Sequence, residues 1–129
     1  MNKINKIEAI VDALASVNEA HKADSLAYRL RNPLLLRSYS RPGRHEVTEE
    51  GVRVFDSHLG GYKAAIFDVA LKINGESHVG IQPTDKLRNL IGVLGIKNEN
   101  DILSIVYFLR KALSNKDIDQ FTVLSYFLE

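Results

Sequence analysis

Carboxylates are the side chains of this chain with the best context for chemistry, and Glu19 is the leading candidate. It stands at the end of a predicted first helix, where the pattern of apolar residues gives way to a loop. The negative end of a helix dipole disfavours an ionised carboxylate, and neighbours such as Val17 and Leu26 would desolvate it further. A carboxyl group that keeps its proton near neutral pH can act as a general acid. The alternative is a solvated glutamate in an exposed last turn.

The sequence excludes several other kinds of catalytic site. It contains no cysteine, which rules out disulfides, thiolate catalysis, iron–sulfur clusters and Cys-based zinc sites. It also lacks a Gly-rich phosphate loop, an HExxH motif, an EF-hand loop and a GxSxG elbow. Four histidines fall in predicted loops without the spacing of metal ligands. They are His21, His45, His58 and His78. We therefore expect no metal and no cofactor.

An arginine-rich segment, residues 29–44, has two interpretations. Its five arginines and absence of acidic residues could bind an anionic polymer such as nucleic acid or cell wall. The alternative is a solvated strand pair whose charge is balanced by the acidic residues that follow it. Few aromatic residues are interleaved with the arginines, and the whole chain carries a net charge of only +1. We therefore expect nucleic acid not to be a partner.

Helical spacing of apolar residues predicts five helices around one core, in a single domain that spans residues 1–129. Hydrophobic residues make up 45% of the chain, which is enough for such a core. The predicted helices span about residues 5–18, 60–74, 84–94, 98–113 and 117–127. Thr84 is the expected N-cap of the third, and Asn98 or Asn100 that of the fourth. Ile118, Phe121, Leu124 and Phe127 should face inward from the last.

The sequence predicts a small β or irregular insertion over residues 33–56, between the first two long helices. Asn32-Pro33 and Pro42-Gly43 are turn signals, and residues 34–39 suit a short extended piece. A short helical turn is also possible over residues 25–30. The expected fold class is mainly α (α+β).

No stretch approaches the roughly 18 apolar residues that a membrane-spanning helix needs. The first ten residues alternate polar and apolar types and do not build the hydrophobic region of a signal peptide. We therefore expect a soluble protein with no membrane span and no export signal.

The order of the segments resembles a known family. The first helix ends at Glu19, Asn32-Pro33 follows, and Gly51-Val52-Arg53-Val54-Phe55 forms a Gly-aromatic piece. Gly61 and Ala65 then open a helix, and Asn98-Glu99-Asn100-Asp101 precedes the last long helix. Over most of residues 7–113 this order resembles small lysozyme-like domains of bacteriophages and prophages, which are related to soluble lytic transglycosylases. The resemblance implies a lysozyme-like fold.

The resemblance also implies a function: cleavage of the MurNAc–GlcNAc linkages of peptidoglycan glycan strands. Glu19 would protonate the leaving oxygen and then act as the base, and the N-acetyl group of the substrate would assist. Asn32, Asn98 and Tyr107 would position the sugar. Should a second carboxylate be used, the sequence leaves three candidates open. They are Asp24, Glu46 and Glu50.

A second hypothesis is a non-catalytic virion structural or assembly protein that keeps the lysozyme-like scaffold. Several positions that are Gly or Asn in the family differ in this chain, for example Ala20 after Glu19 and Leu34 after Pro33. Such a protein would bind other virion proteins through exposed apolar residues, with residues 34–36 as a candidate. Its expected location is the virion or the host cytoplasm, with delivery to the cell wall if it is an enzyme. The sequence does not decide between enzyme and structural protein.

Overall fold

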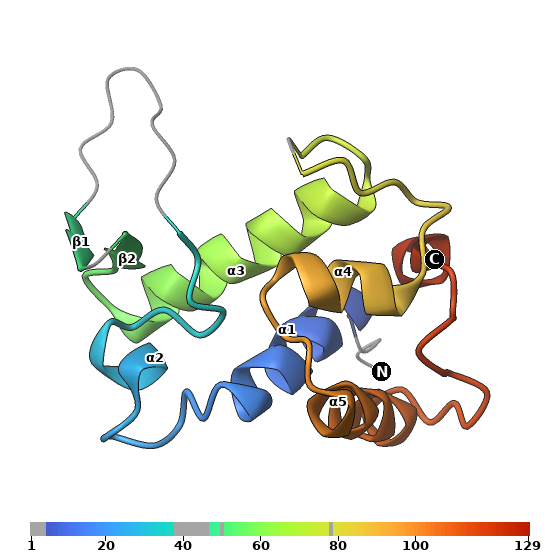
Figure 1. Cartoon of the computed structure of the whole chain (residues 1–129), viewed down its shortest axis with the longest axis horizontal. Helices are drawn as coiled ribbons and strands as arrows, with labels where there is room; N and C mark the ends of the chain where they lie inside the picture. Colours follow the sequence, from blue (N-terminus) through green and yellow to red (C-terminus); the bar gives the residue numbers. More distant parts are fainter. Residues whose placement is uncertain (1–4, 38–46, 50, 78) are drawn as a thin grey trace.

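The computed structural model describes residues 5–37, 47–49, 51–77 and 79–129. This part of the chain is mainly helical, as expected, and carries five α-helices, a two-stranded hairpin and a C-terminal 3₁₀ helix (Figure 1). In chain order the elements are α1 (Lys6–Val17), α2 (Leu26–Arg29), β1 (Val47–Glu49), β2 (Val52–Val54), α3 (His58–Ile73), α4 (Leu87–Val93), α5 (Glu99–Ala112) and η1 (Leu124–Leu128).

Helix α1 forms where the apolar spacing predicts it. The side chain of Asn5 caps its start and accepts hydrogen bonds from the backbone N–H groups of Ile7 and Glu8. Its inward face consists of small and aliphatic side chains that are fully buried, namely Ala9, Ile10, Val11, Ala13 and Leu14. This face packs against both α3 and α5, so α1 connects the two longest helices of the described chain.

Buried apolar side chains from α1, α3, α4, α5 and η1 form one core cluster. Residues 34–36 contribute to it, because Leu34 and Leu36 are 2% and 8% exposed. The expectation that this leucine run forms an exposed binding surface is therefore wrong. In Figure 1, α2 and the hairpin lie at one end of the molecule and η1 at the other.

The hairpin is antiparallel, with Val47 opposite Val54 and Glu49 opposite Val52. It is attached to the segment before it, because the N–H of Arg53 donates to the carbonyl of Leu36 at 3.0 Å. The predicted β insertion is thus present over its described residues. The expected Pro42-Gly43 turn lies outside them.

The predicted helix over residues 117–127 is wrong. Side chains in this segment bind nearby backbone N–H groups: Asn115 accepts from Asp117, Asp119 accepts from Phe121, and Thr122 accepts from Asp119. Such local bonds compete with the helical ladder, and only η1 forms at the end of the chain. Ile118 is buried as predicted, whereas Phe121 is 56% exposed.

The predicted start of the helix near residue 84 is also wrong. Helix α4 begins at Leu87 with Lys86 as its N-cap, and Thr84 lies in a turn. Backbone groups of the preceding residues are bound instead to the C-terminal segment, since Pro83 and Asp85 accept from the N–H groups of Ser125 and Leu124. No helix among the described residues is long and apolar enough to cross a membrane.

Candidate functional site

Glu19 lies in the turn that ends α1 and has a left-handed backbone with φ 57°. Its N–H donates to the carbonyl of Ser16, and the N–H of Ala20 donates to the carbonyl of Ala15. These two bonds define a Schellman motif, in which the left-handed residue most often is glycine. The left-handed backbone of Glu19 is therefore explained by the way in which α1 ends.

The same motif ends each of the five α-helices of the described chain. In each, the left-handed residue and the one after it donate to the last turn of the helix. The left-handed residues that correspond to Glu19 are Arg31 after α2, Gly75 after α3, Gly95 after α4 and Ser114 after α5. The conformation of Glu19 is thus common to these turns and is not a special feature of one catalytic group.

The side chain of Glu19 is exposed. It is 56% accessible, and its Oε1 lies 3.3 Å from the Nζ of Lys22, which is 52% accessible. Leu26, which was expected to desolvate it, is itself 42% exposed. Glu19 is absent from the lining of three cavities on the surface of the described residues.

Asn32 is fully buried, and its side chain binds backbone groups. Its Nδ2 donates to the carbonyls of Leu36 at 3.0 Å and Arg53 at 2.9 Å. Its Oδ1 accepts from the N–H of Leu36 at 2.9 Å. The amide thus closes the turn after α2 and ties it to β2. Its polar atoms are engaged inside the protein and do not line a cavity.

The other two predicted sugar-binding residues lie on α5. Asn98 is the N-cap of that helix and accepts from the N–H of Asn100 at 2.8 Å. Tyr107 is 59% exposed, with the Nζ of Lys111 at 4.6 Å from its ring centre. Of the four predicted site residues, only Tyr107 lines one of the cavities.

Of the three alternative carboxylates, Asp24 is exposed, and Glu46 and Glu50 lie outside the described residues. Within the described part of the chain, no cluster of three or more histidine or acidic side chains could hold a metal ion. His45 and His78 fall outside that part.

A groove of about 430 Å³ opens between residues 34–37, α3 and the end of α4. We call it the α3–α4 groove. Leucines of residues 34–36 form one wall, and Val93, Leu94 and Gly95 form another. The hydrogen bonds of Asn32 hold the first wall in place, so this residue shapes the groove from behind.

The α3–α4 groove is lined by four charged residues, which are Arg37, Asp68, Lys72 and Glu76. Asp68 and Lys72 form an ion pair one turn apart on α3, and their side chains are 18% and 9% exposed. Burial makes each charge dependent on the other, because a lone charge is costly away from water. We did not predict this pair from the sequence, although an acid four residues before a base on a helix is a recognisable signal.

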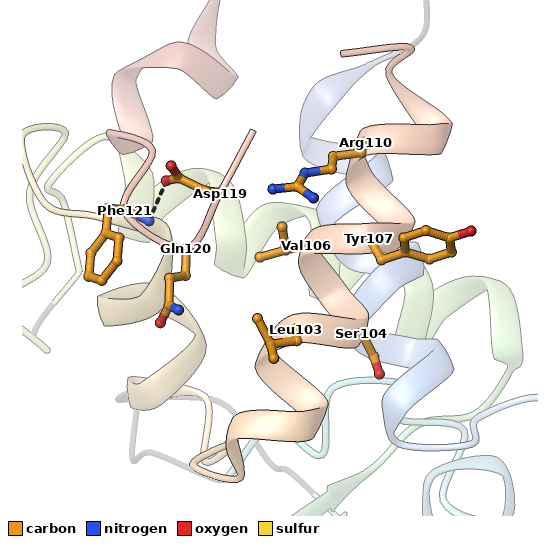
Figure 2. Close-up of a pocket in the computed structure, with 8 residues that line it drawn as sticks. All are labelled: Leu103, Ser104, Val106, Tyr107, Arg110, Asp119, Gln120 and Phe121. Carbon is orange, nitrogen blue, oxygen red and sulfur yellow. Dashed lines mark hydrogen bonds between the residues drawn. The ribbon is translucent and has the colours of Figure 1, made fainter. Parts of the chain in front are cut away.

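A second groove, of about 640 Å³, runs between α5 and residues 119–121 (Figure 2). We call it the α5 groove. Leu103 and Val106 point into it from the helix, Phe121 lies on the opposite side, and Tyr107 points away. Arg110 closes one end and donates from Nε to the carbonyl of Ile118 at 2.6 Å. Leu103, Tyr107 and Phe121 are each more than half exposed, at 53%, 59% and 56%.

Tyr62 links α3 to α1 outside both grooves. Its hydroxyl donates to Oδ1 of Asp12 at 2.7 Å. Burial, together with the hydrogen bond to Asp12, raises the pKa of the Tyr62 phenol well above its usual value. The phenol therefore stays protonated and acts as a fixed donor between the two helices.

Comparison of the chain with protein families, with curated proteins and with solved structures finds no match.

Proposed function

We propose that the chain is a non-catalytic structural or assembly protein that keeps a lysozyme-like scaffold, of the kind that phage virions carry. Fold and activity are separable, and a scaffold can persist after the catalytic group is lost or displaced. The proposal rests mainly on Glu19, the one carboxylate that the family resemblance makes catalytic.

The exposure of Glu19 carries the proposal. A general acid must hold its proton and reach the leaving oxygen of the substrate within hydrogen-bond distance. Glu19 instead lies in a solvated turn, paired with Lys22, and lines neither groove. Its side chain is 56% accessible and is therefore open to water.

Two further observations support the proposal. Asn32 and Asn98 are engaged with backbone groups, the first in the turn after α2 and the second in the N-cap of α5. Meanwhile three large apolar side chains around the α5 groove are exposed, as on surfaces that bind other proteins. The described surface thus offers more for protein contact than for sugar chemistry.

Peptidoglycan cleavage is the second candidate function, and the α3–α4 groove favours it. Its volume and its mixture of leucines with charged side chains would suit part of a sugar chain. In that case Glu19 would be the general acid, and Asn32, Asn98 and Tyr107 would position the substrate. Two carboxylates line this groove, Asp68, which is paired with Lys72, and Glu76.

A turbidity assay with purified cell-wall sacculi separates the two functions. The non-catalytic proposal predicts that the protein leaves the turbidity unchanged, as does the matched variant Glu19→Gln. A commercial muramidase is the positive control. Clearing by the wild-type protein that disappears in a folded Glu19→Gln variant would overturn the proposal and establish the enzyme.

A further inference from the structure

The α3–α4 groove has mainly aliphatic walls. Seven of its thirteen lining residues are leucine or valine, and they come from residues 34–36, α3, the end of α4 and the loop between those helices. Val79 and Val93 are 49% and 42% exposed, so part of the aliphatic wall is open to a molecule from solution. The volume of about 430 Å³ is within the range of small-molecule sites, which is about 300–1,000 Å³. The groove can therefore take up a short aliphatic chain.

Lys72 adds hydrogen-bond donors to this wall. Both partners of the Asp68–Lys72 ion pair line the groove, and the side chain of Lys72 is 9% exposed. An ammonium group carries three N–H donors. Among the described residues only Asp68 accepts from Nζ of Lys72, through Oδ2, which leaves two of the three donors without an acceptor from this part of the chain. A polar group shielded from water is stabilised by a partner, so an oxygen of a bound molecule would be favourable beside Nζ.

The formal charges that line the groove sum to zero. Arg37 and Lys72 are basic, and Asp68 and Glu76 are acidic. Lys72 already has its counter-ion in Asp68, and Arg37 and Glu76 are exposed to water. An anionic ligand would be attracted by two of these groups and repelled by the other two, and the same holds for a cation. A charged ligand would also lose hydration against the aliphatic walls. The balance of charge thus favours a neutral occupant.

We infer that the α3–α4 groove binds a neutral amphiphile, meaning a short aliphatic chain that ends in a hydroxyl or carbonyl oxygen. The chain lies against the leucines and valines, and its oxygen accepts a hydrogen bond from Nζ of Lys72. This binding site goes beyond the proposed assembly role and does not depend on it. A sugar chain, the occupant in the second candidate function, is also neutral, but it carries hydroxyl groups along its length and no aliphatic chain. The experiment therefore includes both.

Titration of the ¹⁵N-labelled protein with 1-hexanol, followed by NMR, tests the inference. We expect saturable shifts of backbone amides that cluster at the residues lining the groove. Affinity should rise about threefold with each methylene from 1-butanol to 1-hexanol, because each one is buried against the aliphatic walls. Hexanoate and hexylamine should bind about tenfold more weakly than 1-hexanol, because each must lose the hydration of its charge. Tri-N-acetylchitotriose, a peptidoglycan-like sugar, should leave the same amides unshifted.

Variants of α4 test whether the groove itself is the site. Val93→Trp fills it and should abolish the saturable shifts. Gly92→Ala is the matched control, because Gly92 precedes Val93, does not line the groove and has nothing within 4 Å of an added Cβ. Circular dichroism and thermal unfolding check that each variant is folded.

A double variant tests the role of the ion pair. Asp68→Leu combined with Lys72→Met removes the donor and leaves no buried charge without its partner, so it should weaken 1-hexanol several-fold. Unchanged binding in this folded variant would overturn the hydrogen bond to Lys72. Wild-type shifts that are absent, do not saturate or scatter over the surface would overturn the site, and these need no variant. Tighter binding of hexanoate, hexylamine or the sugar than of 1-hexanol would overturn the neutral amphiphile as its ligand.

Discussion

Oε1 of Glu19 lies 3.3 Å from Nζ of Lys22, within the turn that follows α1, and both side chains are more than half exposed. An ion pair in this setting contributes little to stability, because water screens both charges. The backbone of Glu19 thus ends α1, while its side chain stays in solvent. Unfolding experiments measure the contribution of the backbone conformation to stability.

The first prediction concerns the left-handed backbone of Glu19. A residue with a Cβ costs about 1 kcal/mol in this conformation relative to glycine. Glu19→Gly should therefore raise the free energy of unfolding by up to about that amount. Ser114→Gly is the matched control, because Ser114 holds the same place after α5 with φ 49°. Chemical denaturation should show similar gains for both variants, and a loss at position 19 alone would show that its side chain has a further structural role.

The second prediction concerns Asn32. Asn32→Ala removes three hydrogen bonds from the buried turn, and the N–H of Leu36 loses its acceptor while the carbonyl of Leu36 keeps the N–H of Arg53. An unpaired buried group costs about 1–3 kcal/mol, so we expect a loss of about 2 kcal/mol or more. Asn98→Ala removes only an exposed N-cap, for which about 1 kcal/mol is expected. Urea unfolding of both variants measures the difference, and equal losses would contradict the role of Asn32 described above.

The third prediction concerns the close approach of α3 to the turn after α2. A Cβ at Gly61 would lie 1.8 Å from the carbonyl oxygen of Arg31, so the two segments must separate in Gly61→Ala. We expect a loss of about 2–3 kcal/mol. Gly92→Ala on α4 is the control, since nothing lies within 4 Å of its added Cβ. That variant should gain up to about 1 kcal/mol from the better helix propensity of alanine. Thermal unfolding should show shifts of opposite sign.

The fourth prediction concerns pH. Because burial and Asp12 raise the pKa of the Tyr62 phenol in the folded state, the unfolded chain releases this proton first. The stability from this group is complete below about pH 10, the ordinary value, and falls as the pH rises further. Denaturant unfolding at increasing alkaline pH should show a shallower decline for Tyr62→Phe than for the wild type. An identical decline would mean that the pKa of the Tyr62 phenol is not raised in the folded protein.

Local signals were sufficient to predict much of the fold. Asn5 and the apolar stripe predict α1 closely, because capping and burial act within one segment. Gly75 and Gly95 likewise mark the ends of α3 and α4. The C-terminal segment differs because its apolar spacing suits a helix while Asn115 and Asp119 form competing turns. Apolar spacing alone does not show whether the helix or these turns will form.

The candidate site was harder to predict, for a geometric reason. From the sequence we expected the carboxylate of Glu19 to lie against the helix end, but its backbone is left-handed and its side chain is 56% accessible. The Asn-Pro pair correctly indicated a turn. The role of Asn32 depends on Arg53, 21 residues later, which no local pattern reveals. Asp68 and Lys72 could have been found from their spacing on one helix.

The central claim is that the chain has no catalytic acid at Glu19, and its most direct test is mass spectrometry of the soluble products from purified sacculi. The account predicts that incubation with the wild-type protein releases no muropeptides above the level of buffer alone, and that Glu19→Gln gives the same result. Release of anhydro-muropeptides by the wild type, lost in a Glu19→Gln variant that unfolds at the wild-type temperature, would contradict it.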